Sequence, residues 1–233
     1  EEHIESYLVS DEGGWTKATD AGYCSEDSRG MALDIITLTN FVQTTQPMAW
    51  RRFERMCTIS PIRQFYKAFE NAVTHGLISV MRHGFKHRGI NFRVCYFKPE
   101  SELNELANEH YKQNVCQCIR QWHYTEANRN SIDMMLAVNG IPVVAIELKN
   151  QLTGQSVDDA MRQWEYNRNP KEYAFGFNKR VLAYFACDLY NVYMTTQLNG
   201  AETVFLPFNQ GSNGAGKDGG AGNPTTEDGK YVT

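Results

Sequence analysis

The sequence predicts an α/β fold, a mixed β-sheet flanked by helices and carrying an N-terminal helical region. Apolar residues recur at helical spacing through much of the first ninety residues, as in the stripe Phe65, Phe69, Val73 and Leu77. Later, two runs rich in Val, Ile, Leu and Met flank an Asn-Gly pair, the strongest short-range hairpin signal. The 233 residues are 42% hydrophobic and 21% charged, which is ordinary for a globular protein of one large domain.

The first half of the chain is predicted to be mainly helical. Residues 1–10 suggest a short helix that ends at Gly13-Gly14. Helices are expected over residues 28–56 and 61–83, the second starting at Ser60-Pro61. A strand is expected over residues 91–97 and a further helix over residues 101–119.

The second half predicts the sheet. A hairpin is expected over residues 131–150, a helix over 156–167, and paired strands near 180–187 and 191–197. Residues 210–230 hold seven glycines and no aromatic residue, which indicates a flexible linker. We therefore expect one domain over residues 1–208, helical to about residue 90 with a core over about 91–208, followed by a linker over 209–233.

The register of the predicted hairpin decides which side chains share a face. A strict two-residue loop at Asn139-Gly140 would place Asp133 opposite Ile146. A three-residue loop, or one β-bulge, shifts the pairing by one residue and sets Asp133 opposite Glu147. Because Pro142 has no N–H and disfavours a regular ladder, we predict the looser turn, with Asp133, Glu147 and Lys149 on one face.

Two carboxylates and an ammonium at one place match the needs of metal-dependent phosphodiester hydrolysis. Carboxylate oxygens suit Mg²⁺, which activates a water and offsets charge on the phosphate. A lysine can orient that water or stabilise the transition state. The alternative is that Glu147 and Lys149 form an ordinary surface ion pair, which would contribute little.

The stretch SIDMMLAVNGIPVVAIELKNQLTGQSVDDAMRQWEYNRNP resembles the N-terminal nuclease domain of the R subunit of type I restriction enzymes. FNKRVLAYFACD, MTTQL, TVFLPFNQG and GAGNP further along the chain are also similar to that family. The resemblance runs from about Phe92 to Pro224 and implies a PD-(D/E)xK nuclease fold. It also implies cleavage of double-stranded DNA, Mg²⁺ as cofactor, and methyltransferase and specificity subunits as partners.

By this resemblance, Asp133 and Glu147 are metal ligands and Lys149 is the catalytic lysine. The family's following helix carries a Gln with a Tyr four residues on; this chain has Gln163 and Tyr166, three apart, so that Asn167 or Arg168 are alternatives for the Tyr role. An ordinary amphipathic helix is the competing interpretation. The superfamily also places a glutamate of the first helix near the metal, and Glu5 is the candidate, with Glu2 as the alternative and a solvated helix face as the competing interpretation of either.

The net charge of −4 is unusual for a DNA-binding protein, and only two local segments are basic. One is Arg51, Arg52 and Arg55. The other, residues 82–93, is expected to be a short loop whose Arg82, Lys86 and Arg88 could follow a phosphate backbone. Simple solvation is the alternative for charge runs of this length.

The sequence shows no stretch of about 20 apolar residues and no signal peptide, so a cytoplasmic protein without membrane contact is expected. Its six cysteines suggest reduced thiols rather than a disulfide framework. GAGKDGG lacks the Ser or Thr of a phosphate-binding loop, so ATP is expected to act only through a motor beyond residue 233. A repair or recombination nuclease of the same superfamily and a non-catalytic subunit-docking domain remain the alternatives.

Overall fold

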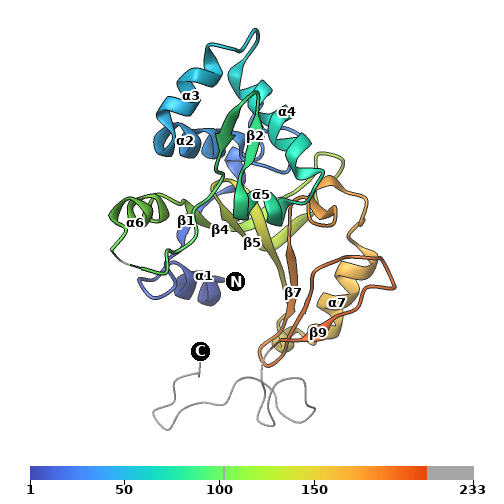
Figure 1. Cartoon of the computed structure of the whole chain (residues 1–233). Helices are drawn as coiled ribbons and strands as arrows, with labels where there is room; N and C mark the ends of the chain where they lie inside the picture. The colour runs from blue at the N-terminus through green and yellow to red at the C-terminus, as the bar shows by residue number, and fades with distance from the viewer. Residues whose placement is uncertain (102, 209–233) are drawn as a thin grey trace.

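The computed structural model describes residues 1–101 and 103–208 and shows a mixed seven-stranded sheet with helices packed around it (Figure 1). This confirms the predicted α/β class. The sheet has the order β1-β4-β5-β6-β7-β8-β9. Its strands are β1 (Thr16–Ala18), β4 (Cys116–His123), β5 (Ser131–Val138), β6 (Ile141–Leu148), β7 (Ala183–Cys187), β8 (Val192–Thr195) and β9 (Leu206–Pro207). The predicted linker, 209–233, lies outside the described residues.

Two parallel pairings interrupt an otherwise antiparallel sheet. β1 runs parallel to β4, and β6 runs parallel to β7. The second pair is connected through α7 (Val157–Tyr166), because parallel neighbours need a crossover rather than a tight turn. β7 and β8 are antiparallel, as the sequence predicts for the strands on either side of residues 188–190.

The helical region comprises α2 (Ile35–Thr45), α3 (Pro47–Glu54), α4 (Pro61–Val73) and α5 (Leu77–His83) beside a small hairpin of β2 (Phe85–His87) and β3 (Ile90–Phe92). The predicted stripe at Phe65, Phe69, Val73 and Leu77 is buried, each side chain being 2% exposed or less. It forms one hydrophobic core with residues of α2, α3 and the hairpin. Gly76, with φ of 105°, separates α4 from α5.

Several predicted elements differ from the structure. The helix expected over 28–56 is divided: residues 28–34 precede it as turns, and Pro47 begins a second helix after Gln46. The strand expected over 91–97 is only β3, and the loop expected over 82–93 contains the β2–β3 hairpin.

The helix expected over 101–119 is α6 (Glu105–Lys112), and residues 116–119 instead begin β4. β4 forms a ladder with β5 from Cys116 opposite Val138 to His123 opposite Ser131. The apolar face expected of that helix is exposed, with Leu103 at 94% and Leu106 at 62%. Tertiary pairing with β5 therefore overrides the helical spacing.

The central β5–β6 hairpin has a tight turn together with a bulge. Val138 lies opposite Ile141, so Asn139-Gly140 is a two-residue turn, contrary to the looser turn expected. Both turn residues have positive φ, 52° and 78°. The register shifts between Leu136 and Ala137, and beyond it Met134 lies opposite Ile146. Continuing one step sets Asp133 across from Glu147, which is the pairing that the one-bulge alternative predicted.

The two faces of the sheet are covered by different helices. Side chains that alternate along a strand point to opposite faces. Met134 and Leu136 pack with Leu8, at the end of α1 (Glu2–Leu8), and with Trp15. Met135 and Ala145 belong to the other core, with Val157, Ala160 and Trp164 of α7. Asp133 lies two residues from Met135 in β5, and Glu147 lies two residues from Ala145 in β6. Both carboxylates therefore belong to the face of the sheet that α7 covers.

Candidate functional site

The candidate site lies at the end of the central hairpin, where charged side chains enter an apolar strand. Glu147 is fully buried, between Ile146 and Leu148 in β6, while Asp133 of β5 is half-buried. Asp133 accepts a hydrogen bond through Oδ2 from the backbone N–H of Leu148 at 2.7 Å and a longer one, 3.4 Å, through Oδ1 from Gln121. The bulge thus brings two carboxylates to one place on the sheet.

The carboxylate of Glu147 is satisfied by two side chains from beyond the strand. Arg168 donates to Oε1 from Nε at 3.0 Å and from Nη2 at 2.5 Å. Gln163 donates from Nε2 to Oε2 at 2.9 Å. Arg168, itself 5% exposed, also donates to the carbonyl of Ser131 at 2.7 Å. A buried charge is tolerated when it is paired and hydrogen-bonded in this way.

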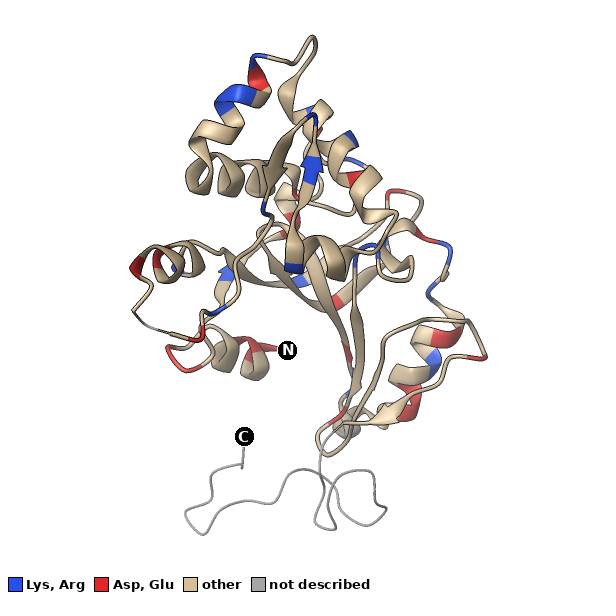
Figure 2. Cartoon of the chain, viewed as in Figure 1, with Lys and Arg blue, Asp and Glu red and all other residues tan. Residues whose placement is uncertain are grey.

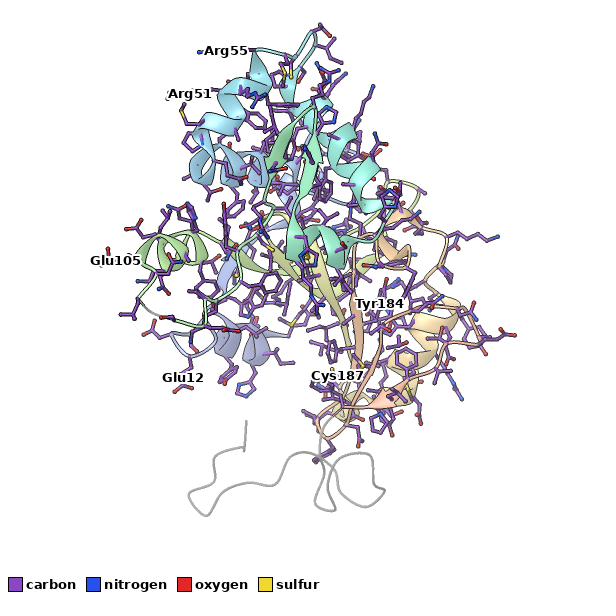
Figure 3. All side chains as sticks on the ribbon, in the orientation of Figure 1. Glu12, Arg51, Arg55, Glu105, Tyr184 and Cys187 are labelled. Carbon is purple, nitrogen blue, oxygen red and sulfur yellow. The ribbon has the colours of Figure 1, made fainter. Side chains whose placement is uncertain are left out.

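Lys149 is connected to Glu147 through Gln163. Its backbone N–H donates to the carbonyl of Cys187 at 2.8 Å, which continues the β6–β7 pairing by one residue. Cys187, labelled in Figure 3, marks the end of the sheet at which the site lies. The ammonium of Lys149 donates to Oε1 of Gln163, and the amide nitrogen of Gln163 donates to Glu147. The amide of Gln163 therefore bridges the two charged groups, with its oxygen towards the ammonium of Lys149 and its nitrogen towards the carboxylate of Glu147.

The pKa of Glu147 is raised from the ordinary 4.5 to about 8, chiefly by burial and also by the nearby Asp133 carboxylate. The guanidinium of Arg168 and the ammonium of Lys149 act in the opposite direction. A strongly displaced pKa beside a second carboxylate is a common property of functional sites. The site thus combines a desolvated acid with fixed cationic neighbours.

Helix α7 supplies Gln163 and sets the position of the chain at Arg168. Its N-terminus carries a capping box, in which Ser156 and Asp159 bond each other's backbone N–H groups. Val157, Ala160 and Trp164 face the sheet, and the indole Nε1 of Trp164 donates to the carbonyl of Phe185 at 3.0 Å. Anchoring by Trp164 presents Gln163, its neighbour, to the end of β6.

Tyr166 is not brought to the carboxylates. It is the last residue of α7 and its side chain is 69% exposed. Arg168, one of the two alternatives that the sequence left open, is the residue that contacts Glu147. The sequence gives a partial signal for it, a basic residue directly after a helix whose first turn is acidic.

Glu5 lies with α1 over the opposite face of the sheet. Its carboxylate accepts from Nζ of Lys17 at 2.7 Å and lies 3.5 Å from Arg120, whose strand position pairs with Met134. These cations lower the pKa of Glu5, the hydrogen bond from Lys17 being the largest cause. Glu2 is exposed, 3.9 Å from Arg120. Neither Glu5 nor Glu2 therefore lies beside Asp133, where the metal site was expected.

Gln121 is a site neighbour that the sequence did not suggest. It lies across from Asp133 in the β4–β5 ladder and has φ of 51°, an unusual value within a strand. Its amide accepts from the hydroxyl of Ser131 at 2.7 Å and donates to Glu1 at 2.9 Å as well as to Asp133. Nothing in the local sequence indicates this backbone conformation.

The three residues predicted to bind DNA lie in the helical region rather than beside the carboxylates. Arg82 is in the last turn of α5, Lys86 is in β2 and Arg88 is in the turn of the small hairpin. All three are exposed. Arg88 donates from Nη1 to the carbonyl of Met56 at 3.1 Å, and the carbonyl of Arg82 accepts from Arg93 at 2.7 Å.

The donor set of the site consists of oxygen and nitrogen groups rather than thiols or imidazoles. Within residues 1–101 and 103–208, no group of three or more His, Cys, Asp or Glu side chains is placed to hold a metal ion. All six cysteines are free thiols. No helix in the same described ranges combines the length and the apolar character needed to cross a bilayer. The two carboxylates that the hairpin brings together are those of Asp133 and Glu147.

Comparison with known families identifies the chain over most of its length. The family described as the Type I restriction enzyme R protein N terminus (HSDR_N) matches residues 18–206. A search of curated proteins found no match. The matched range begins at β1, ends at β9 and contains Asp133, Glu147 and Lys149. The chain therefore belongs to the family of type I restriction enzyme R protein N-terminal domains.

Proposed function

We propose that this chain is the nuclease domain of a type I restriction enzyme R subunit and cleaves double-stranded DNA with Mg²⁺. The observation that supports this most is the arrangement at the hairpin end. A buried Glu147 shares a face with Asp133 and is joined to Lys149 through the amide of Gln163. Membership of the restriction enzyme family supports restriction rather than repair as the setting.

The two carboxylates suit a hard divalent cation in chemical type. Asp133 and Glu147 would hold it, since Mg²⁺ prefers oxygen ligands and is commonly bound by one or two carboxylates. The displaced pKa of Glu147 shows how little water stabilises its charge, and a cation would supply that stabilisation. When bound, Mg²⁺ activates a water and offsets charge on the phosphate.

The chain's own side chains have separate tasks in this proposal. Lys149 presents its ammonium beside the carboxylates, where it can hold the attacking water or offset the developing charge on the scissile phosphate. Gln163 fixes the direction of that ammonium. Arg168 is a positioning residue, because it fixes one oxygen of Glu147 and leaves the direction of the carboxylate determined before DNA arrives.

The partners follow from the family. In this proposal, methyltransferase and specificity subunits select the DNA, and ATP is used by a motor domain of the same subunit. A subunit-docking domain is the competing function, and in that case the carboxylates would have only a structural role. The two functions predict different results for a folded protein without Lys149. A nuclease domain would lose DNA cleavage, whereas a docking domain would leave cleavage unchanged.

The test combines metal binding with cleavage. Calorimetric titration of the chain with Mn²⁺ should show binding that disappears in Asp133→Ala and Glu147→Ala. Asp158→Ala, which removes an exposed carboxylate of α7, is the matched control and should bind as the unmodified chain does. In the assembled enzyme, Lys149→Ala should reduce cleavage of plasmid DNA by at least about 10²-fold, with ATP hydrolysis retained.

Lys171→Ala, at an exposed lysine, is the control for cleavage and should cut normally. Equal Mn²⁺ binding in all four proteins would remove the metal site from the proposal. Normal cleavage by folded Lys149→Ala would contradict the nuclease function and favour the docking domain.

A further inference from the structure

Positive charge is concentrated in one part of this acidic chain. Residues 46–98 contain ten Lys and Arg against two Glu, a net charge of +8 within a protein of net charge −4. These residues form α3, α4, α5 and the β2–β3 hairpin. Figure 2 shows Lys and Arg on α3, which also carries the acidic Glu54, and on the hairpin, whereas Asp and Glu recur on α7, α1 and α6.

The fold brings two basic segments that are separate in sequence to one surface. We define the arginine surface as Arg51, Arg52, Arg55 and Arg88. α3 and the hairpin line a shallow hollow of about 500 Å³, whose lining includes the three arginines of α3 together with Gly89, Ile90 and Asn91. Arg88 donates to the carbonyl of Met56, just beyond α3, which fixes the turn against that helix.

Packing directs the arginines outward. Trp50 and Phe53 of α3 are buried, and the ring of Phe53 lies 5.5 Å from that of Phe92 in β3. Because these aromatic residues occupy the inner side of the helix, the neighbouring arginines must project into solvent. Figure 3 shows Arg51 and Arg55 on the outer side of α3. The turn at Gly89 lies against this side of α3, since a Cβ built there would be 4.0 Å from Nη2 of Arg52, an ordinary van der Waals distance.

The basic side chains of this surface form no ion pair within the described part of the chain, although Glu54 lies on α3 between Arg51 and Arg55. None of the ion pairs found there includes Arg51, Arg52, Arg55 or Arg88. Glu70, one of the two acidic residues of the region, is instead paired with the buried Arg180. A guanidinium offers five N–H donors in a planar arrangement that matches phosphate oxygens, and Arg88 uses one nitrogen for the carbonyl of Met56.

We propose that the arginine surface binds the phosphate backbone of duplex DNA, apart from the carboxylates of the candidate site. Interfaces with nucleic acid are more polar and more positively charged than those between proteins, whose centres are depleted in charged residues. Met48 is the one large exposed apolar side chain in the lining of the hollow. The surface holds and positions DNA without reading bases, and this role does not depend on cleavage.

The test measures binding of the chain to a 30-base-pair duplex by fluorescence anisotropy in EDTA, over a series of salt concentrations. The variant Arg51→Ala/Arg52→Ala/Arg55→Ala should weaken binding by on the order of tenfold and lower the salt slope by about 2 to 3, near one unit for each lost phosphate contact. The matched control Lys112→Ala/Lys171→Ala/Lys179→Ala removes the same charge at exposed positions outside the surface and should change both quantities less.

A third variant, with lysine at the three arginine positions, should retain most of the salt slope because the charge is unchanged. Circular dichroism melts confirm that each variant is folded. Equal losses in the alanine variant and the control would overturn the proposal, since binding would then follow net charge alone. Binding of inorganic phosphate at the arginines without any effect on duplex affinity would also overturn it. If Lys149→Ala loses cleavage but binds the duplex normally, the defect lies in the candidate site and leaves the arginine surface unaffected.

Discussion

In the helical region, charged side chains surround an aromatic core, whereas the sheet carries charged side chains inside its core. Phe53, Phe65 and Phe92 pack ring against ring with centroids 5.3 to 6.2 Å apart, and the arginines of α3 lie outside them. In the sheet, Glu147 is fully buried with Arg168. One region gains stability from apolar packing, while the other contains polar groups whose hydrogen bonds must all be made.

The largest difference should appear when one arginine is removed from each region. Arg168→Ala leaves Glu147 buried without its cation, which should cost about 3–5 kcal/mol in the free energy of unfolding at pH 9, where the carboxylate is charged. Arg55→Ala removes an exposed side chain and should change stability by under about 0.5 kcal/mol. Urea unfolding of both variants measures this. Equal values would show that the buried pair is no more important to stability than an exposed charge.

A smaller effect is expected from the aromatic core. Phe65→Leu keeps an apolar side chain in place but removes ring contacts with Trp50, Phe53, Phe85 and Phe92. We expect a loss of about 1–2 kcal/mol, since aromatic pairs add to burial and Leu fills the space only in part. Unfolding midpoints of this variant, compared with Ile59→Leu at an exposed position, test the value. No change would mean that burial alone accounts for the packing.

A more gradual effect should appear with pH. The folded-state pKa of Glu147, about 8, lies above the ordinary 4.5, so the native protein holds a proton that the unfolded chain releases between these values. Its contribution to stability should therefore be complete below about pH 4.5, fall as pH rises towards 8, by at most about 1.4 kcal/mol per pH unit, and level off above that. Glu147→Gln lacks this titration. The free energy of unfolding of the unmodified chain and of Glu147→Gln is measured in EDTA from pH 5 to 9. A difference between the two proteins that stays constant with pH would contradict the raised pKa of Glu147.

The sequence predicts the central hairpin, α7 and the strand pair that follows because their apolar spacing and turn residues are local. It also places Asp133 and Glu147 together, since Pro142 disfavours a regular ladder, although the shift comes from a bulge between Leu136 and Ala137 and not from the looser turn that we predicted. It does not reveal β1 and β4, because their pairing depends on residues such as Thr16 and Gln117 that are distant in sequence.

The remaining site residues depend on geometry that side-chain chemistry alone does not encode. Gln121 reaches Asp133 from a strand whose first four residues were predicted to be helical, with a positive φ that residue type does not indicate. Arg168 reaches Glu147 only because the chain turns back after α7. The family's Gln-to-Tyr pattern directed attention to Tyr166, whose exposed side chain shows that helical spacing alone does not define a contact.

The position of Arg168 just beyond α7 has a consequence for how the site forms. The contacts that build it close short loops: Leu148 to Asp133 spans 15 residues, Gln163 to Glu147 spans 16 and Arg168 to Glu147 spans 21. The contact that attaches β1 to β4, Thr16 to Cys116, spans 100 residues. Closing a loop of that length costs about 1.4 kcal/mol more in chain entropy than closing one of 21. The charged centre therefore belongs to the low-contact-order part of the molecule, whose assembly does not need to wait for the edge strand.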